Sequence, residues 1–351
     1  MRIARYLAGG VIALSAGACF AWGSLGHEAI GEIAARLIAG TNAEQQVKAI
    51  LGPDLTLAQI AVWPDCAKGV VRHTNGQFEY ISNDNAYKEC IPLAGEKAAF
   101  ESYIKRNWDQ CKPSPGEEKC HAQYHYMDVE TTYPSYEDAV AGVSDHDIVH
   151  SIDAAIAVLQ GKPAPSPYSI KDKAEALRLL AHFAGDITQP LHTVSIYMTP
   201  DAQPVDVDKQ GPGPHLDTSS EGGNLLMDGT RRLHAEWDNI PAYFEIGGSK
   251  FDDLVAQART IPAPGGDVTT WSRSWANDTI AVAKDAYGPV TVEPHAASVP
   301  RKPTNTPKKA TKWQIDLPDD YADTRVRIQQ QQLAKAGANL ANVLKAIWPD
   351  R

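Results

Sequence analysis

Two histidine–aspartate pairs with the same spacing lie in the second half of the chain. The segment H-F-A-G-D-I-T-Q-P-L-H places His182 and Asp186 four residues apart, and His192 follows just after a proline. The segment H-A-E-W-D repeats the spacing with His234 and Asp238. Residues four apart lie on one face of a helix, about one turn from each other. Imidazole nitrogens and carboxylate oxygens are ligands that zinc takes when thiolates are absent, so the pattern favours a zinc site.

One such pair would be weak evidence, because many helices carry a histidine and an aspartate at this spacing as a surface hydrogen bond. Two pairs with a third histidine just beyond a proline form a stronger pattern. The alternative interpretation is that these groups are hydrogen-bonded polar residues of the core without a metal.

A competing motif, H-D-I-V-H, spans His146 to His150 and imitates the H-E-x-x-H motif of zinc proteases with aspartate in place of glutamate. The shorter carboxylate is poorly placed to activate a zinc-bound water, and no third ligand follows convincingly. We therefore expect an exposed histidine pair at the start of a helix. Four further histidines are expected to be solvated or in loops: His73, His121, His215 and His295.

Helical periodicity dominates the elements that would position these groups. Apolar residues recur at spacings of three and four in segments 28–38, 153–159, 174–186 and 326–348, and no alternating strand pattern competes with them. Stretches rich in proline and polar residues at 113–119, 162–167, 199–214 and 299–312 predict loops. They create no compositionally distinct half, so we expect an all-α protein with a single multi-helix domain over residues 22–351.

Residues 1–21 have the pattern of a secretory signal peptide. Arg2 and Arg5 precede an apolar stretch that ends in small residues and is too short to anchor the chain comfortably in a bilayer. Cys19 follows A-G-A as a lipidated cysteine would, but Ala16 stands where leucine is expected, so we favour cleavage before Trp22. No later apolar run is long enough for a transmembrane helix, and the mature chain should be periplasmic or secreted.

The charge of the chain argues against a general nucleic-acid-binding surface. The sequence has 33 lysines and arginines against 43 aspartates and glutamates, a net charge of −10. Removing Arg2 and Arg5 leaves 31 against 43, or −12. A protein that bound nucleic acid through counterion release would be basic. Any phosphate that this chain handles must therefore be met by something other than lysine and arginine side chains.

Four cysteines remain after residue 21, an even number in an oxidising compartment: Cys66, Cys90, Cys111 and Cys120. Two disulfides are the natural interpretation, and we prefer a pair between Cys111 and Cys120 that closes the polar loop K-P-S-P-G-E-E-K. The alternatives are free thiols or zinc ligation. Zinc ligation is disfavoured because no two of these cysteines form a C-x-x-C pair.

The motifs of this chain and their order along it resemble those of the secreted trinuclear-zinc nucleases of fungi, plants and bacteria. The resemblance rests on the two histidine–aspartate segments, on V-W-P-D, on Y-H-Y-M-D and on a mature start W-G-x-x-G-H. It covers Trp22 to about Asn239 and, weakly, the last helix. Members of this all-α family are single-strand-specific endonucleases and 3'-nucleotidases, distantly related to zinc phospholipase C. The resemblance implies a monomeric phosphodiesterase that acts on single-stranded DNA and RNA and on 3'-nucleotides and leaves 5'-phosphorylated products.

The resemblance also implies three zinc ions. One would be bound by Asp65, His125, His182 and Asp186, and a second by His192, His234 and Asp238. The third would take His27, Asp186 as a bridge, and the free α-amino nitrogen and carbonyl oxygen of Trp22. Cleavage before Trp22 would thus create a bidentate ligand, because a peptide-bonded nitrogen has its lone pair delocalised into the amide.

Further residues are assigned to the substrate by the same resemblance. Tyr126 would stack a nucleobase, while Asp128 and Asn224 would bond its edge. Stacking contributes on the order of 1–3 kcal/mol per base. Lys68 would lie near the phosphate and completes the expected catalytic set with two of the metal ligands, Asp65 and Asp186. The alternative for Tyr126 is a buried aromatic residue of the core.

Some positions depart from the family pattern. The separation between Asp65 and His125 is longer than in compact members, and Cys66 lies directly beside a ligand, which puts the shape of the cleft rim in doubt. Pro64 and Asn339 replace a common alanine and a common arginine.

Two other functions compete with a nuclease. A phospholipase C-like phosphodiesterase is disfavoured by the aspartate of H-A-E-W-D, where that branch tends to carry glutamate, and by the pair Tyr126 and Asp128. A non-catalytic exported zinc-binding protein would be excluded by an activity assay on denatured DNA.

Overall fold

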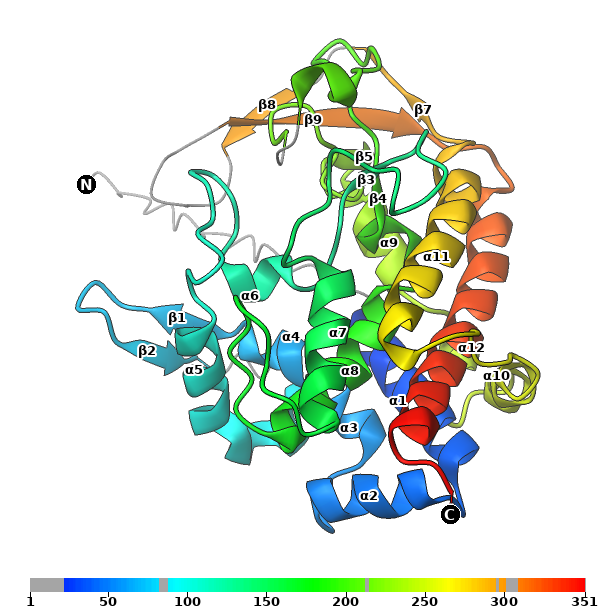
Figure 1. The fold of residues 1–351 in the computed structure, drawn as a ribbon. Helices are drawn as coiled ribbons and strands as arrows, with labels where there is room; N and C mark the ends of the chain where they lie inside the picture. Colours follow the sequence, from blue (N-terminus) through cyan, green and yellow to red (C-terminus); the bar gives the residue numbers. More distant parts are fainter. Residues whose placement is uncertain (1–21, 82–87, 212–214, 295–296, 301–308, 351) are drawn as a thin grey trace, which may run out of the picture.

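The computed structural model describes residues 22–81, 88–211, 215–294, 297–300 and 309–350, and helices dominate this part of the chain (Figure 1). The α-helices are α1 Gly23–Ile38, α2 Asn42–Leu51, α3 Leu57–Ile60, α4 Trp63–Ala67, α5 Lys97–Arg106, α6 Cys120–Gln123, α7 Ile148–Leu159, α8 Lys173–Asp186, α9 Leu233–Asp238, α10 Phe251–Ala258, α11 Trp271–Tyr287 and α12 Tyr321–Ile347. Short 3₁₀ turns are η1 Lys88–Glu96, η2 Pro190–His192, η3 Val207–Gln210, η4 Ala242–Phe244 and η5 Val268–Thr270. The predicted all-α architecture is confirmed.

The four helices predicted from apolar periodicity correspond to α1, α7, α8 and α12. Each begins earlier than the periodicity indicates, and for α7 and α8 the reason is an aspartate cap. The Asp147 side chain accepts hydrogen bonds from the first turn of α7, and the Asp172 side chain accepts one from Glu175 at the start of α8. Such side chains satisfy amide groups that have no partner within the helix.

Close packing brings the long helices together around α8, which contacts α1, α7 and α12 (Figure 1). At the crossing of α1 and α12, a Cβ added to Gly337 would lie 2.3 Å from Ile33 Cγ2. Gly31 approaches the backbone of Leu57 and Ala58 in α3 in the same way, where an added Cβ would lie 2.5 Å from Leu57 O. Because these glycines have no side chain, α1 packs closely against α3 and α12. This packing fixes the position of α1, which carries the predicted ligand His27.

Strands are short, and the longest one contradicts a predicted loop. The strands are β1 Val70–Arg72, β2 Phe78–Tyr80, β3 Val129–Glu130, β4 Val194–Ser195, β5 Leu226–Asp228, β6 Arg231–Arg232, β7 Thr291–Val292, β8 Ala297–Pro300 and β9 Lys309–Asp316. β1 pairs with β2, β3 pairs with β4, and β5 to β9 form a sheet across one end of the helices (top of Figure 1). The prediction of a loop over 299–312 was wrong at both ends. The missed signal is W-Q-I-D, in which Trp313 and Ile315 are buried and alternate with exposed residues.

The four cysteines form two disulfides, Cys66–Cys90 and Cys111–Cys120, so the preferred pair is confirmed. Free thiols and zinc ligation are thereby excluded for these residues. Among the described residues, none of the helices combines the length and apolar character needed to cross a membrane. The predicted signal peptide, residues 1–21, lies outside the described part of the chain, as does His295.

Candidate metal centre

The last two turns of α8 supply the centre of the site. His182 and Asp186 are fully buried, and His182 Nε2 lies 3.1 Å from Asp186 Oδ2. His182 Nδ1 donates a hydrogen bond to the Ala61 carbonyl oxygen at 2.6 Å. This bond fixes the imidazole tautomer, so the lone pair of Nε2 points toward the cluster.

The Asp186 carboxylate is approached on both oxygens by histidines from three different segments. His27, in α1, places Nε2 3.1 Å from Oδ1, while His125 Nδ1 and His182 Nε2 lie 2.9 Å and 3.1 Å from Oδ2. Asp65, in α4, completes the group, with its Oδ1 3.6 Å from His182 Nε2. The ligand atoms of a tetrahedral zinc site with bonds near 2.0–2.1 Å lie about 3.3 Å apart, so these separations suit metal ligation.

A second group forms around the proline turn after α8. His192 Nε2 lies 3.0 Å from His234 Nε2, and His234 Nε2 lies 3.6 Å from Asp238 Oδ2. The Nδ1 atoms of the two histidines donate to the carbonyl oxygens of His125 and Gly222 at 2.9 Å and 2.6 Å. Carbonyl partners of this kind orient metal-binding imidazoles.

The carboxylate of this second group has its own partner, which our sequence reading missed. Gln189 Nε2 donates to Asp238 Oδ1 at 2.8 Å. Gln189 belongs to T-Q-P and lies directly before the proline that stops the helix. This position was the signal in the sequence that could have identified it as part of the site.

Three sets of buried side chains could each hold a metal ion, with ligand atoms that lie within 4.8 Å of one another: His27, His182 and Asp186; Asp65, His125 and His182; and His192, His234 and Asp238. These sets follow the predicted groups closely. The difference is that His182 belongs to both of the first two sets. Asp186 lies between His27 on one side and His125 on the other, which is where a bridging carboxylate would be.

The electrostatics of the site favour a cation. Burial, assisted by the Lys68 charge, lowers the pKa of His125 to about 3, and burial also lowers the pKa of His27 and His234. Burial alone would raise the pKa of Asp186, but the surrounding histidines hold it well below its usual range. The imidazoles of His27, His125 and His234 are therefore neutral, as metal ligation requires, beside an ionised carboxylate. His182 differs, because burial lowers its pKa but the Asp186 and Asp65 carboxylates raise it above the usual value.

Five buried polar atoms of the cluster have no hydrogen-bond partner among the described residues, namely both ring nitrogens of His27, both carboxylate oxygens of Asp65, and Asp186 Oδ1. Leaving buried polar groups unpaired is costly, and a bound metal ion would explain them. Gly185 makes room for the His27 ring, because an added Cβ would lie 2.9 Å from His27 Nδ1.

Trp22 lies against the end of α8. Its side chain is fully buried, and indole Nε1 donates to the Gly185 carbonyl oxygen at 2.9 Å and to Thr188 Oγ1 at 3.1 Å. Its backbone is left-handed, with φ of 48°, and its carbonyl oxygen accepts a hydrogen bond from Gly26. The indole thus anchors the start of α1 one residue away from Asp186.

The residues predicted to contact substrate lie next to the candidate metal ligands. Lys68 Nζ lies 2.8 Å from Asp65 Oδ1. Tyr126 and Asp128 are half-buried, on the segment that continues from His125 to β3. Asn224 follows the Gly222–Gly223 turn beside His234, and its side-chain amide donates to the Glu221 carbonyl oxygen at 3.0 Å. Lys68 is thus in an ion pair with the candidate ligand Asp65, and Tyr126 directly follows the candidate ligand His125. Asn224 lies two residues after Gly222, whose carbonyl oxygen accepts a hydrogen bond from His234.

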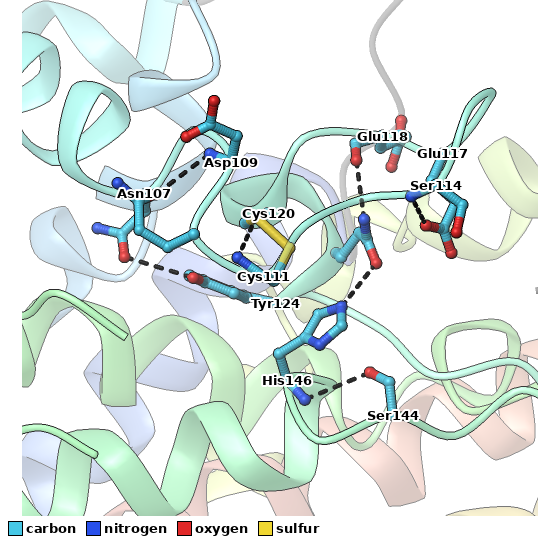
Figure 2. The surroundings of a disulfide bond; sticks show 12 residues. Asn107, Asp109, Cys111, Ser114, Glu117, Glu118, Cys120, Tyr124, Ser144 and His146 are labelled. Atoms are coloured by element: carbon cyan, nitrogen blue, oxygen red, sulfur yellow. Dashed lines mark hydrogen bonds between the residues drawn. A yellow bond between two sulfur atoms is a disulfide. The ribbon is translucent and has the colours of Figure 1, made fainter. Parts of the chain in front are cut away.

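Figure 2 shows the Cys111–Cys120 disulfide and the loop that it closes, which carries Glu117 and Glu118. Gln123 Nε2 donates to the Glu118 carbonyl oxygen at 2.8 Å, and Gln123 Oε1 lies 2.9 Å from His146 Nε2. Burial raises the pKa of Tyr126 well above its usual value, and the nearby carboxylate of Glu118 raises it further. An acidic loop closed by a disulfide therefore lies beside Tyr126, a contact that the sequence analysis did not predict.

The H-D-I-V-H motif does not form a metal site within the described residues. The Asp147 carboxylate instead accepts hydrogen bonds from Val149 N and His150 N, at 3.0 Å and 3.3 Å, and from Tyr136 Oη at 2.8 Å. The expectation of an exposed histidine pair was wrong, because His146 and His150 are both partly buried against these partners.

His121 also departs from the prediction of a solvated residue. It is buried in α6, its ring stacks on Trp108 with a centroid separation of 5.8 Å, and burial lowers its pKa to about 3. The cause is the adjacent disulfide, which holds Cys120 in the core. His73 is exposed and His215 is partly buried, after the 199–214 stretch.

Comparison with known proteins agrees with this geometry. The model of the S1/P1 nuclease family matches residues 22–349. Nuclease PA3 from a Penicillium species and nuclease P1 from Penicillium citrinum are each 29% identical to the chain over 245 residues, which cover 65% of this chain and 78% of each relative. The matched residues include all three metal-binding sets, and the chain therefore belongs to the S1/P1 nuclease family.

Proposed function

We propose that this protein is a zinc-dependent phosphodiesterase that hydrolyses single-stranded DNA and RNA to 5'-phosphorylated products and also acts as a 3'-nucleotidase. Membership of a nuclease family supports hydrolysis of nucleic-acid ester bonds. The observation that carries the finer proposal is the presence of three buried histidine and aspartate sets that could each hold a metal ion, two of which share His182.

The donor set fits zinc, because it consists of imidazoles and carboxylates in a buried cluster. In the proposal Asp186 would be shared by two ions. One would be held with Asp65, His125 and His182, and the other with His27 and the α-amino nitrogen and carbonyl oxygen of Trp22. Zinc ions held there would supply a water that is deprotonated near neutral pH and positive charge for the developing phosphate.

Lys68 adds a fixed cation at the phosphate side of the cluster. Burial alone would lower the pKa of Lys68, but Asp65 and Asp186 raise it, so the ammonium group stays charged. Asp65 holds this ammonium at 2.8 Å and thereby positions it beside the candidate metal ligands. Metal ions and one lysine would provide the positive charge that binds the phosphate in a protein that is otherwise acidic.

The base would be bound at the rim, with Tyr126 as the stacking platform and Asp128 and Asn224 at the base edge. Both the Tyr126 ring and the Asp128 side chain are half-buried, so part of each surface faces solvent. A base locked in a duplex cannot reach such a ring without unstacking, which favours single strands.

We propose further that the protein is exported with residues 1–21 as a signal peptide and acts as a monomer without a stable protein partner. Two disulfides support an oxidising compartment.

The test is elemental analysis of the chain that begins at Trp22, run with hydrolysis assays on denatured DNA, RNA, 3'-AMP and phosphatidylcholine vesicles. We expect about three zinc ions per chain, cleavage of both nucleic acids with 5'-phosphate ends, and release of phosphate from 3'-AMP. Lipid hydrolysis without nucleic-acid hydrolysis would assign a phospholipase C-like activity instead. Bound zinc without hydrolysis of any substrate would indicate a non-catalytic zinc-binding protein.

A further inference from the structure

Asp238 ends α9, a helix of six residues that also carries His234. Helices shorter than roughly 12–15 residues are marginal on their own, so contacts with the rest of the fold must fix the direction of α9 and of these two side chains. Asp238 is buried, and the oxygens of a buried carboxylate need partners. Those partners decide which oxygen of Asp238 a metal ion could reach.

The first turns of α12 hold the backbone of α9. Three residues at a spacing of four lie on one face of α12 and bond to α9. Tyr321 Oη accepts a hydrogen bond from Trp237 Nε1 at 2.9 Å, Arg325 Nη1 donates to the Glu236 carbonyl oxygen at 2.9 Å, and Gln329 Nε2 donates to the carbonyl oxygens of Trp237 and Asn239 at 2.8 Å and 3.0 Å. The chain on both sides of Asp238 is thereby held, and the freedom that remains is rotation about the torsions of its side chain.

Gln189 restrains those torsions. Its side chain is fully buried, and Nε2 donates a hydrogen bond to Asp238 Oδ1 at 2.8 Å. The orientation of Gln189 is set at its other end, because Oε1 accepts a hydrogen bond from the Leu191 backbone amide at 2.5 Å. A flipped carboxamide would turn its oxygen toward the carboxylate and its NH₂ group toward the amide, and would lose both bonds. The Leu191 amide thus keeps the donor of Gln189 directed at Asp238.

The same side chain connects two members of one metal-binding set. Gln189 caps η2, the turn that ends at His192, and it bonds across to Asp238, which belongs to the same set as His192. Gln189 occupies Asp238 Oδ1, whereas Oδ2 lies 3.6 Å from His234 Nε2. One glutamine therefore relates the ligand in η2 to the ligand in α9, although Gln189 and Asp238 are 49 residues apart in the sequence.

The donor on Gln189 is neutral, which suits a metal ligand. An arginine or lysine at this place would also satisfy the buried oxygen, but its charge would offset the negative charge that attracts a metal ion. Asp65 shows the difference, because its Oδ1 pairs with the Lys68 ammonium at 2.8 Å. Gln189 satisfies one oxygen of Asp238 and leaves the charge of the carboxylate to a bound ion.

We propose that Gln189 is a positioning residue of the metal centre. It holds one oxygen of Asp238 and the turn that carries His192, so that Asp238 Oδ2, His192 and His234 are aligned to bind one metal ion. This inference rests on the proposed function, because it concerns one of the same three metal-binding sets. Loss of the bond from Gln189 to Asp238 should weaken metal binding at this set and leave the other two sets unchanged.

The test is a zinc titration of the chain that begins at Trp22, in competition with a chromophoric chelator, for the native protein, Gln189→Met and Gln189→Asn. Methionine fills a similar volume but has no N–H donor. Asparagine can still cap the turn, because its side chain accepts a hydrogen bond from the amide two residues on, but it is one methylene shorter and cannot also reach Asp238. In both variants we expect one zinc ion to bind about 10–100-fold more weakly and the others to bind within about twofold of the native affinity.

Gln332→Met is the matched control. Gln332 is buried like Gln189, and its Nε2 donates at 2.8 Å to the carbonyl oxygen of Thr188, the residue directly before Gln189. The control therefore removes a buried amide beside the same turn, but one that bonds to the backbone and not to the Asp238 carboxylate. It should lower the unfolding temperature as Gln189→Met does and still bind every zinc ion with native affinity.

Equal weakening of zinc binding in Gln332→Met and Gln189→Met would overturn the proposal, because Gln189 would then act only through stability. Native zinc affinity in Gln189→Asn would overturn it as well. Gln189→Asn keeps the cap on the turn, so it provides the comparison if Gln189→Met does not fold.

Because the titration measures metal binding, its outcome is separate from that of the proposed function. If the native chain binds zinc but hydrolyses no nucleic acid, and Gln189→Asn still loses affinity for one ion, the proposed function fails and Gln189 remains a positioning residue. If the native chain hydrolyses denatured DNA and both Gln189 variants bind zinc as the native chain does, the inference about Gln189 alone fails.

Discussion

His182 and Asp186 at the end of α8 and His146 and His150 at the start of α7 are both pairs with a spacing of four, yet they have different surroundings. Around the first pair, His27, His125 and Asp65 arrive from other segments and place ligand atoms within 4.8 Å of one another. Around the second pair, the intervening Asp147 caps its own helix. The difference teaches that spacing selects a helix face, while a metal site needs further ligands to converge on that face.

The position within the helix explains much of this difference. The first turn of α7 has amide groups without intrahelical partners, so a carboxylate there is taken up as a cap. At the C-terminal end of α8 no amide is free, and the Asp186 carboxylate is left to histidines. The aspartate that ends α8 is therefore available to the histidines of the cluster, whereas the aspartate that caps α7 is not.

Replacing Asp186 with alanine should abolish activity and release more than one metal ion, because its two oxygens face different histidines. Zinc counting and rates on denatured DNA measure the effect. Asp147→Ala is the matched control, since it removes a cap and should lower the free energy of unfolding by about 0.5–2 kcal/mol while zinc is kept. A full zinc complement in the Asp186 variant would show that this carboxylate is not a bridge.

A chain that retains an extra methionine before Trp22 should lose at least about a hundredfold in activity, the upper range for disturbing the surroundings of a metal. The free amine would move one residue away, and an amide nitrogen would take its place. The natural Trp22 terminus should be fully active in the same assay. Mass spectrometry of the amino terminus, zinc counting and initial rates decide between them, and equal metal content with equal rates would remove Trp22 from the site.

Tyr126→Ala should weaken binding of single-stranded substrates by about 1–3 kcal/mol and leave the metal content unchanged. The physical reason is loss of the stacking surface beside the ligand His125. A minimal phosphodiester without a base is the control substrate. If its hydrolysis fell as far as that of DNA, Tyr126 would be a packing residue that supports the metal ligands.

His150→Gln should have the smallest effect, confined to stability at acidic pH. The hydrogen bond to Asp147 raises the pKa of His150. A raised pKa means that the charged form stabilises the fold below the unfolded value, near 6.5, and that this contribution is lost as the pH rises through the folded value. Thermal unfolding of both chains should therefore differ at pH 5 and converge at pH 8. Loss of zinc in this variant would mean that the H-D-I-V-H motif binds metal after all.

The sequence by itself determined the helical fold and the residues of the metal-binding sets. Apolar periodicity located α1, α7, α8 and α12, because the face that a helix buries depends only on local spacing. The two histidine–aspartate pairs were visible for the same reason. The motif resemblance added His27, Asp65 and His125, which no local spacing connects to α8.

Only the tertiary structure decided what those residues meet. The contacts of Gln189 with Asp238 and of Arg325 with Glu236 join segments distant in sequence, and no periodicity encodes such contacts. β9 was missed because a strand is completed by hydrogen bonds to other strands, and its four-residue alternation was too short to stand out among proline-rich neighbours. Asp147 and Asp186 have different partners for the same physical reason, because a carboxylate bonds to the donors that the fold brings nearest. The fold brings backbone amides to Asp147 and imidazoles to Asp186.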